Sequence, residues 1–291
     1  MIKFSRVMTF STETYRQLIN DIKLIYPGRE AEAIAELLVE HLGIEKTKML
    51  AGSPGGLNTD QSQWLDNALL RLKNHEPIQY ILGTTSFYGL EFIVNAHVLI
   101  PRQETEELVD LIIKENSELS ESQKILDIGC GSGCIAISLK KAFPQTSVNA
   151  CDISPKALEV AKSNAEKHHV EINFYEKDVL HIASIPGNCD IIVSNPPYVT
   201  ESEKEKMQPN VLQYEPSQAL FVSNQDPLVF YTAIIELAFR NLNPGGKIYF
   251  EINETKGHDV EILMNAVGFN KVRIIQDLNN KDRIATGIKY G

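Results

Sequence analysis

Two short segments of this chain combine residue types that can do chemistry. The first is Asn195-Pro196-Pro197-Tyr198, which follows the apolar run 189–193 and a single serine, Ser194. A residue before proline is pushed out of the helical region and each proline has a fixed φ, so the segment is stiff. Because proline nitrogens donate nothing, the segment offers acceptors, namely the Asn195 side-chain oxygen and the Pro196 carbonyl. Two acceptors suit an NH2 group, which has two hydrogens to donate.

The chemistry that such a segment favours is transfer of a group to an NH2 nitrogen. An amide or arylamine nitrogen is a poor nucleophile because its lone pair is delocalised. Acceptors that orient the NH2 group favour a pyramidal nitrogen aimed at an electrophilic methyl group, so catalysis would be mostly proximity and orientation. Tyr198 can pack on the planar substrate group and supply a polar tip. The alternative is a rigid proline turn with a capping asparagine.

The second segment is the glycine-rich run ILDIGCGSGCIAI, residues 125–137. Gly129, Gly131 and Gly133 allow a tight turn and close backbone approach, and the turn opens a helix whose N–H groups can face a ligand. The run also fits the dinucleotide pattern GxGxxA, so by itself it does not select a cofactor.

Two carboxylates near this run distinguish between cofactors. Asp152 ends the next strand and is placed to accept hydrogen bonds from ribose hydroxyls, as expected for NAD or an adenosyl ligand. Asp127 lies just before the first glycine, where a pyrophosphate would be repelled and an ammonium or sulfonium attracted. S-adenosylmethionine (SAM) carries both cations and no phosphate, so SAM is the predicted cofactor. We expect Asp178 to accept from the adenine amino group and Val179 to wall the ring.

The pattern around these segments predicts a doubly wound α/β domain. Strands and helices alternate from Lys124 onward and a hairpin closes the chain: strands at 124–129, 147–153, 172–179, 189–195 and 247–252, helices at 134–143, 226–242 and 257–267 and after Ser154, and a hairpin at 272–289. Repeated strand-helix units indicate a parallel sheet covered on both faces, with the last strand antiparallel beside the sheet edge. Ligands of such sheets bind at the carboxyl ends of the strands, where both segments lie.

The N-terminal part of the chain has a different pattern. Helical periodicity covers 11–26, 28–43 and 58–77, and no strand pattern occurs before Tyr80. Residues 79–101 read as a hairpin linker and 104–118 as an amphipathic helix. The predicted domains are therefore a helical domain (1–76), a linker (77–101) and a catalytic domain (102–291).

Composition limits the functional classes. The 291 residues carry a net charge of −10, which disfavours binding to nucleic-acid phosphates and favours a protein or small-molecule substrate. No apolar run is long enough for a bilayer, and the N-terminus lacks a convincing signal peptide. The four cysteines form no CxxC pair and no His cluster has metal spacing, so we expect reduced thiols, a cytoplasmic location and no metal.

Together, DIGCGSG, Asp152 and NPPY resemble class I SAM-dependent methyltransferases that modify planar NH2 groups. That group includes N6-adenine DNA methyltransferases and the enzymes that methylate release factors. Segments 77–109 and 214–231, with LNPGGKIYFEI and DRIATG, resemble the release factor glutamine methyltransferases of the PrmC/HemK type. The similarity is strong from residue 77 and only architectural before it. Gln103, Val179 and Asn253 depart from the usual proline, adenine-covering aromatic and glycine.

The resemblance implies a Rossmann-like fold with a seven-stranded mixed sheet, a small N-terminal helical domain and a β-hairpin linker. It implies methyl transfer from SAM to the side-chain N5 of the glutamine in the GGQ motif of class I peptide-chain release factors. The helical domain would dock the release factor. We expect a monomer that contacts neither nucleic acid nor membrane directly.

The resemblance and the residues together give the expected site. Cofactor-binding residues are Asp127, Gly129, Cys130, Gly131, Ser132, Gly133, Asp152, Asp178, Val179 and Asn195. Substrate-binding residues are Asn195, Pro196, Pro197 and Tyr198, of which Asn195, Pro196 and Tyr198 are the catalytic candidates. Thr105 or Glu106 is expected near the site, with helix capping or hinge contacts of the segment after Arg102 as the alternative.

Three other functions remain open. An N6-adenine or exocyclic-amine nucleic-acid methyltransferase presents a similar NH2 group, but the chain is acidic and shows neither a basic run nor a wedge for base flipping. A NAD-dependent dehydrogenase conflicts with Asp127, and no hydride-transfer partners are evident. A non-catalytic interaction protein would not need an intact NPPY segment.

Overall fold

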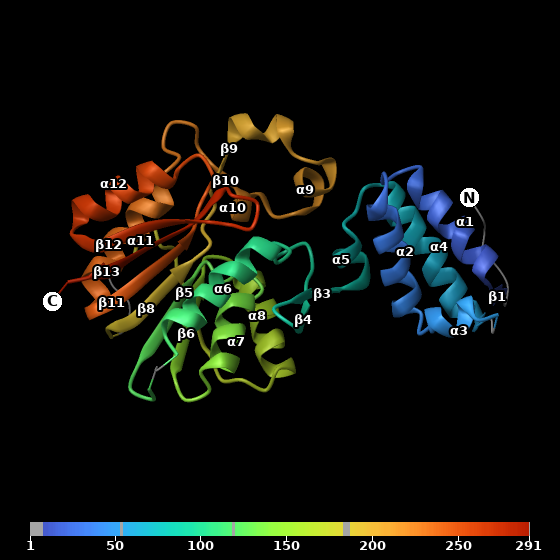
Figure 1. Cartoon of the computed structure of the whole chain (residues 1–291), viewed down its shortest axis with the longest axis horizontal. Coiled ribbons are helices and arrows are strands. Elements are labelled where there is room, and N and C mark those ends of the chain that lie inside the picture. The colour runs from blue at the N-terminus through green and yellow to red at the C-terminus, as the bar shows by residue number, and fades with distance from the viewer. Residues whose placement is uncertain (1–7, 53–54, 118–119, 183–186, 291) are drawn as a thin grey trace. The chain divides into compact units, whose positions relative to one another are not determined.

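The computed structural model describes residues 8–52, 55–117, 120–182 and 187–290, and it divides into two compact units (Figure 1). The first unit comprises the chain up to Gly83 together with Gln208–Tyr214, and the second comprises Thr84–Met207 and Glu215–Gly291. The segment 77–101 is shared between them, because its start is a short helix of the first unit and its hairpin belongs to the second.

The first unit is helical. Its helices are α1 (Thr12–Lys23), α2 (Arg29–His41), α3 (Lys46–Leu50), α4 (Thr59–Lys73), α5 (Ile78–Leu82) and α9 (Pro209–Tyr214). Capping boxes at Ser11 and Asn58 satisfy N–H groups in the first turns of α1 and α4. The apolar faces of the helices pack around buried leucines such as Leu38 and Leu65.

This unit also contains a two-stranded antiparallel sheet, β1 (Met8–Phe10) with β2 (Gly55–Leu57). The expectation that no strand precedes Tyr80 was therefore wrong. Each strand has three residues and pairs with a partner far along the chain, so local alternation could not reveal it. The predicted hairpin at 79–101 is β3 (Thr84–Phe87) with β4 (Leu90–Ile93), and its expected first residues form α5 instead.

The second unit is built on a seven-stranded mixed sheet of order β12-β13-β11-β8-β5-β6-β7, which confirms the predicted sheet. Its strands are β5 (Lys124–Ile128), β6 (Ser147–Asp152), β7 (Asn173–Glu176), β8 (Cys189–Ser194), β11 (Leu242–Glu251), β12 (Phe269–Gln276) and β13 (Asp282–Lys289). The last strand β13 is antiparallel, as predicted, and lies between β11 and the edge strand β12. The burial of residues 284–287 fits that inner position, whereas β12 is largely exposed.

Helices cover both faces of this sheet (Figure 1). One face packs against α6 (Gln103–Glu115), α7 (Cys134–Ala142) and α8 (Pro155–Lys167), and the other against α11 (Val229–Asn241) and α12 (Gly257–Val267). Strand alternation supplies the two cores, since Ile125 and Ile191 face the first layer and Leu126 and Ile192 face the second. The helix predicted after Ser154 is α8, and the Ser154 side chain caps it by accepting from Ala157 N.

The carboxyl ends of β5, β6, β8 and β11 meet at one edge of the sheet. After β8 the chain makes a long excursion through β9 (Val199–Thr200), the 3-10 helix η1 (Glu201–Lys206), α9, α10 (Ser217–Leu220) and β10 (Phe221–Val222). Strands β9 and β10 pair in parallel. Within the described part of the chain, no helix has the length and apolar character needed to cross a membrane.

Candidate active site

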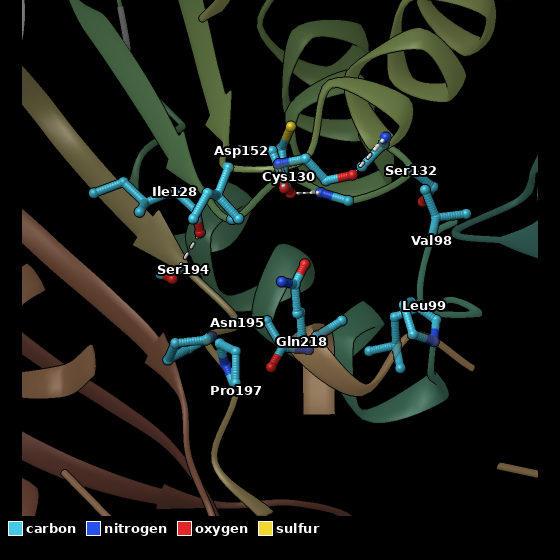
Figure 2. A pocket seen from close by; sticks show the side chains of 18 of the residues that line it. Val98, Leu99, Ile128, Cys130, Ser132, Asp152, Ser194, Asn195, Pro197 and Gln218 are labelled. Carbon is cyan, nitrogen blue, oxygen red and sulfur yellow. Dashed lines mark hydrogen bonds between the residues drawn. The ribbon is translucent and has the colours of Figure 1, made fainter. Parts of the chain in front are cut away.

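A cavity of about 360 Å³ opens at the carboxyl ends of β5, β6 and β8 (Figure 2). Figure 2 shows Cys130, Ser132 and Asp152 on one side of it and Asn195 and Pro197 on the opposite side. Of the predicted site residues, Gly129, Cys130, Gly131, Ser132, Asp152, Asp178, Val179, Asn195, Pro196 and Pro197 line the cavity. The two segments singled out by the sequence therefore face each other across one space.

The glycine loop is shaped to let a ligand approach its backbone. Gly129, Gly131 and Gly133 have φ of 73°, 54° and 80°, a region that favours glycine. A Cβ on Gly133 would lie 3.2 Å from the Ala161 Cβ, so this glycine permits the loop to pack on α8. A Cβ on Gly129 or Gly131 would meet no protein atom within 4 Å, which leaves room on that side of the loop. Gly133 does not line the cavity and supports the loop from behind.

Asp152 connects the glycine loop to the end of β6. Its two carboxylate oxygens accept hydrogen bonds from the N–H groups of Gly131 and Ser154, each at 2.9 Å. A carboxylate has about four acceptor positions, so the two that remain can receive ribose hydroxyls. Burial raises the pKa of Asp152 above its ordinary value, while these hydrogen bonds oppose the shift.

Asp178 and Val179 lie on the cavity wall after β7. Asp178 accepts from Leu180 N at 2.9 Å and contacts His181 Nδ1 at 2.6 Å. The bond with His181 holds the pKa of Asp178 below its usual range. The Asp178 carboxylate thus has further acceptor positions beside the apolar Val179. This arrangement suits an adenine ring and its amino group.

Asp127 lies beneath the glycine loop and does not belong to the cavity lining. Its side chain is fully buried, and Oδ2 accepts from Ala136 N at 3.2 Å near the start of α7. Its other oxygen, Oδ1, has no hydrogen-bond partner among the described residues. Burial, with a smaller contribution from Asp152, raises the pKa of Asp127 to about 7. Its predicted direct attraction to the cofactor stays a prediction.

The raised pKa of Asp127 makes stability depend on pH. Between the ordinary value of 3.8 and about 7, the folded protein binds more protons at this site than the unfolded chain, so stability falls as pH rises. We expect Asp127→Asn to remove this loss. Between pH 5 and pH 8, the free energy of unfolding of the unmodified protein should fall by about 2 kcal/mol relative to that of Asp127→Asn.

Urea unfolding followed by circular dichroism at both pH values measures this difference. Asp259→Asn, at a half-exposed position on α12, serves as a control for the same change of side chain. A difference between Asp127→Asn and the unmodified protein that is equal at pH 5 and pH 8 would show that Asp127 ionises normally.

The NPPY segment is anchored at both ends. Before it, Ser194 Oγ donates to the Ile128 carbonyl at 2.7 Å, which ties the end of β8 to β5. Within it, Asn195 Nδ2 donates to Thr105 Oγ1 at 3.3 Å and the Tyr198 hydroxyl donates to Glu251 Oε1 at 3.1 Å. Tyr198 does not belong to the cavity lining, so its predicted packing on the substrate stays a prediction. The observed contact makes it a support of the segment.

The segment that leads into α6 contributes to the site in part. Thr105 lines the cavity, whereas Glu106 accepts from Tyr88 N at 2.7 Å and so fastens the hairpin to α6. Arg102 also lines the cavity and forms a 2.5 Å ion pair with Glu215, which is almost fully buried. Thr105 is thus the residue of this segment that reaches the NPPY asparagine.

Sequence reasoning missed Glu251 at the end of β11. Its side chain is buried and accepts hydrogen bonds from Thr105 and Tyr198. Burial raises the pKa of Glu251, and those two hydrogen bonds and Arg283 oppose the shift. The available signal was one acidic residue within the otherwise apolar run IYFEI, at the carboxyl end of the strand where ligands bind.

The donor and acceptor set of this cavity fits SAM. The glycine loop leaves space for close approach, Asp152 offers free acceptor positions, and Ile128, Val179 and Leu99 supply apolar walls. Asp152 and Asp178 give the cavity an acidic lining that is compatible with a cationic ligand. Within the part of the chain that the structure describes, no group of three or more metal-binding side chains occurs.

Comparison with known proteins identifies relatives for nearly the whole chain. Two family models match, the PrmC N-terminal domain over residues 15–83 and the Methyltransferase small domain over 104–220. The release factor glutamine methyltransferase of Bacteroides thetaiotaomicron is 46% identical over 94% of this chain and 98% of its own length. That of Flavobacterium psychrophilum is 46% identical, with 94% of this chain and 97% of the relative covered.

A solved structure supports the fold assignment. The crystal structure of a methyltransferase from Pyrococcus furiosus superposes with a TM-score of 0.51 at 18% identity, over 78% of this chain and 100% of that one. At this identity the likeness concerns the fold alone, and it agrees with the predicted Rossmann-like methyltransferase sheet.

Proposed function

Because this chain belongs to the release factor glutamine methyltransferase family, we propose that it methylates a glutamine side chain of class I peptide-chain release factors, with SAM as methyl donor. The predicted acceptor is the N5 nitrogen of the glutamine in the GGQ motif. The observation that carries the proposal is that Asn195 and Pro196 line the same cavity as the glycine loop and Asp152, with Asn195 on the side opposite Asp152.

The geometry supports a mechanism of orientation. When bound, SAM supplies a methyl group on a sulfonium, which is a strong leaving group. Asn195 Oδ1 and the Pro196 carbonyl would accept the two hydrogens of the glutamine NH2 and aim its lone pair at the methyl group. The nitrogen would gain the methyl group as the methyl–sulfur bond breaks, and it would release one of its two hydrogens as a proton to water. The prolines keep these acceptors fixed, so little ordering is needed when substrate binds. Asn195 lines the space used by both ligands.

The other residues take supporting roles in this proposal. Asp152 accepts the ribose hydroxyls, Asp178 and Val179 hold the adenine, and the loop from Gly129 to Gly133 lies against the methionine part. Asp127, buried beneath the loop, adds a negative charge that attracts the cationic part of SAM. Pro197 shapes the glutamine pocket, and Tyr198 supports it through Glu251.

We assign the docking of the release factor to the helical unit. Its exposed leucines offer apolar surface for a protein partner, namely Leu24, Leu37, Leu50 and Leu70. The acidic net charge also favours a protein substrate over nucleic acid. The protein would act as a monomer in the cytoplasm, without a direct contact to nucleic acid or membrane.

Transfer of radiolabelled methyl from SAM tests this function. Three substrates are compared: a class I release factor, the same factor with its GGQ glutamine changed to alanine, and unmethylated DNA. We expect label on the first alone. Label on the alanine factor would place the acceptor elsewhere in the protein, and label on DNA alone would keep the methyltransferase but replace the substrate.

A further inference from the structure

A chain of hydrogen bonds runs from the NPPY asparagine to a buried carboxylate. Asn195 Nδ2 lies 3.3 Å from Thr105 Oγ1, and Thr105 Oγ1 lies 2.5 Å from Glu251 Oε2. The other oxygen of Glu251 lies 3.1 Å from the hydroxyl of Tyr198. Thr105 and Glu251 are 3% and 1% exposed, so water does not compete for these bonds. The chain joins α6, β11 and both ends of the NPPY segment.

With Glu251 ionised, the form that its two hydroxyl partners and Arg283 favour, counting hydrogens sets the direction of every bond in this chain. The ionised carboxylate of Glu251 can only accept, so Thr105 and Tyr198 each donate their single hydroxyl hydrogen to it. The 2.5 Å distance is typical of a hydroxyl that donates to a carboxylate. With its hydrogen committed, Thr105 Oγ1 can only accept, and the only donor on the Asn195 side chain is its NH2 group.

The consequence concerns which end of the Asn195 amide faces the substrate. The two ends have nearly the same shape, so packing alone does not distinguish them. Because the NH2 end is held by Thr105, the oxygen end is left for the cavity. If the amide were reversed, an NH2 group would face the NH2 group of the incoming glutamine, two donors without an acceptor.

We propose that Thr105 and Glu251 are positioning residues that set the orientation of the Asn195 amide, so that its oxygen faces the methyl-accepting nitrogen. This inference rests on the proposed function for its substrate, but its structural part concerns only the hydrogen bonds of this chain. Glu251 also holds Tyr198, so one carboxylate sets the amide at the start of the segment and supports the ring at its end.

Three substitutions test the proposal on the full-length protein. Thr105→Val keeps the approximate shape of the side chain and removes its hydroxyl, and Thr105→Ser keeps the hydroxyl. Glu251→Gln leaves a single acceptor oxygen for two donors and allows the chain to reverse. We expect kcat to fall about 100-fold in Thr105→Val and about tenfold in Glu251→Gln, and to stay within about threefold in Thr105→Ser. The Kd for SAM should stay nearly unchanged in all three.

A spectroscopic measurement separates this proposal from the proposed function. The side-chain amide signal of Asn195 is assigned in a ¹H–¹⁵N spectrum by its loss in Asn195→Ala. Slow hydrogen exchange of that amide is expected in the unmodified protein and in Thr105→Ser, and fast exchange in Thr105→Val. This readout needs no substrate. A protein that fails to methylate release factors would therefore overturn the function and leave this test intact.

Two outcomes would overturn the positioning role. Unchanged kcat and unchanged exchange in Thr105→Val would show that the hydroxyl does not hold Asn195. An equal loss of kcat in Thr105→Ser and Thr105→Val would assign the effect to packing of the side chain at this buried position rather than to its hydrogen bond.

Discussion

Asn195→Ala is expected to lower kcat for glutamine methylation by about 1,000-fold or more, while the Kd for SAM rises by no more than about tenfold. The substitution removes the oxygen that accepts from the substrate NH2, and the delocalised amide nitrogen is then no longer oriented toward the methyl group. The cofactor keeps its other contacts, since the glycine loop and Asp152 lie on the opposite side of the cavity (Figure 2). Single-turnover transfer and calorimetric SAM titration measure the two quantities.

A matched control for this experiment is Asn265→Ala on α12. Asn265 is an exposed asparagine that donates to the Glu261 carbonyl of its own helix, outside the cavity lining. Its replacement should leave both quantities unchanged. If Asn195→Ala turned over as fast as the unmodified protein, the orientation mechanism would be wrong. If SAM affinity fell as much as activity, Asn195 would mainly bind the cofactor.

Asp152→Ala is expected to raise the Kd for SAM by about 100-fold. The carboxylate is needed twice, because it accepts from the N–H groups of Gly131 and Ser154 and it leaves acceptor positions for the ribose hydroxyls. Its removal loosens the glycine loop and takes away the charged acceptor together. At saturating SAM, kcat should recover to within about tenfold, since Asn195 and Pro196 are untouched.

Asp152→Asn and Asp259→Ala complete this comparison. The asparagine keeps one acceptor oxygen, so its loss of affinity should fall between those of the alanine variant and the unmodified protein. Asp259 is half-exposed on α12, outside the cavity lining, and its replacement should have no effect on SAM binding. If Asp152→Ala bound SAM with unchanged affinity, the cofactor would have to bind without the acceptor at the end of β6.

Much of the fold could be predicted from the chain because its determinants are local or periodic. Strand alternation, helical periodicity and punctuation by glycine and proline indicated the two architectures and most elements, including the helix that starts after Ser154. The short β1–β2 pair and the inner place of β13 could not be read in this way, since each depends on pairing with residues that local patterns do not specify.

The residues that offer chemistry were likewise determined by the sequence alone. Glycines after one strand, an acid after the next and Asn-Pro-Pro after a third must meet at one sheet edge once the strands are parallel. Their residue types then suggest an adenosyl ligand with a cationic centre and an NH2 acceptor. The relatives confirm the family that these segments predicted, the release factor glutamine methyltransferases.

What only the tertiary structure decided is how these residues are supported. Asp127 and Tyr198 were expected to face ligands. In the folded protein, Asp127 instead accepts from Ala136 N, and the Tyr198 hydroxyl donates to Glu251. Thr105 and Glu251 lie far apart in the chain and share a hydrogen bond only because α6 packs beside β11. Sequence specifies which groups are present at the strand ends. The direction in which each group donates or accepts depends on buried partners that meet only after the chain has folded.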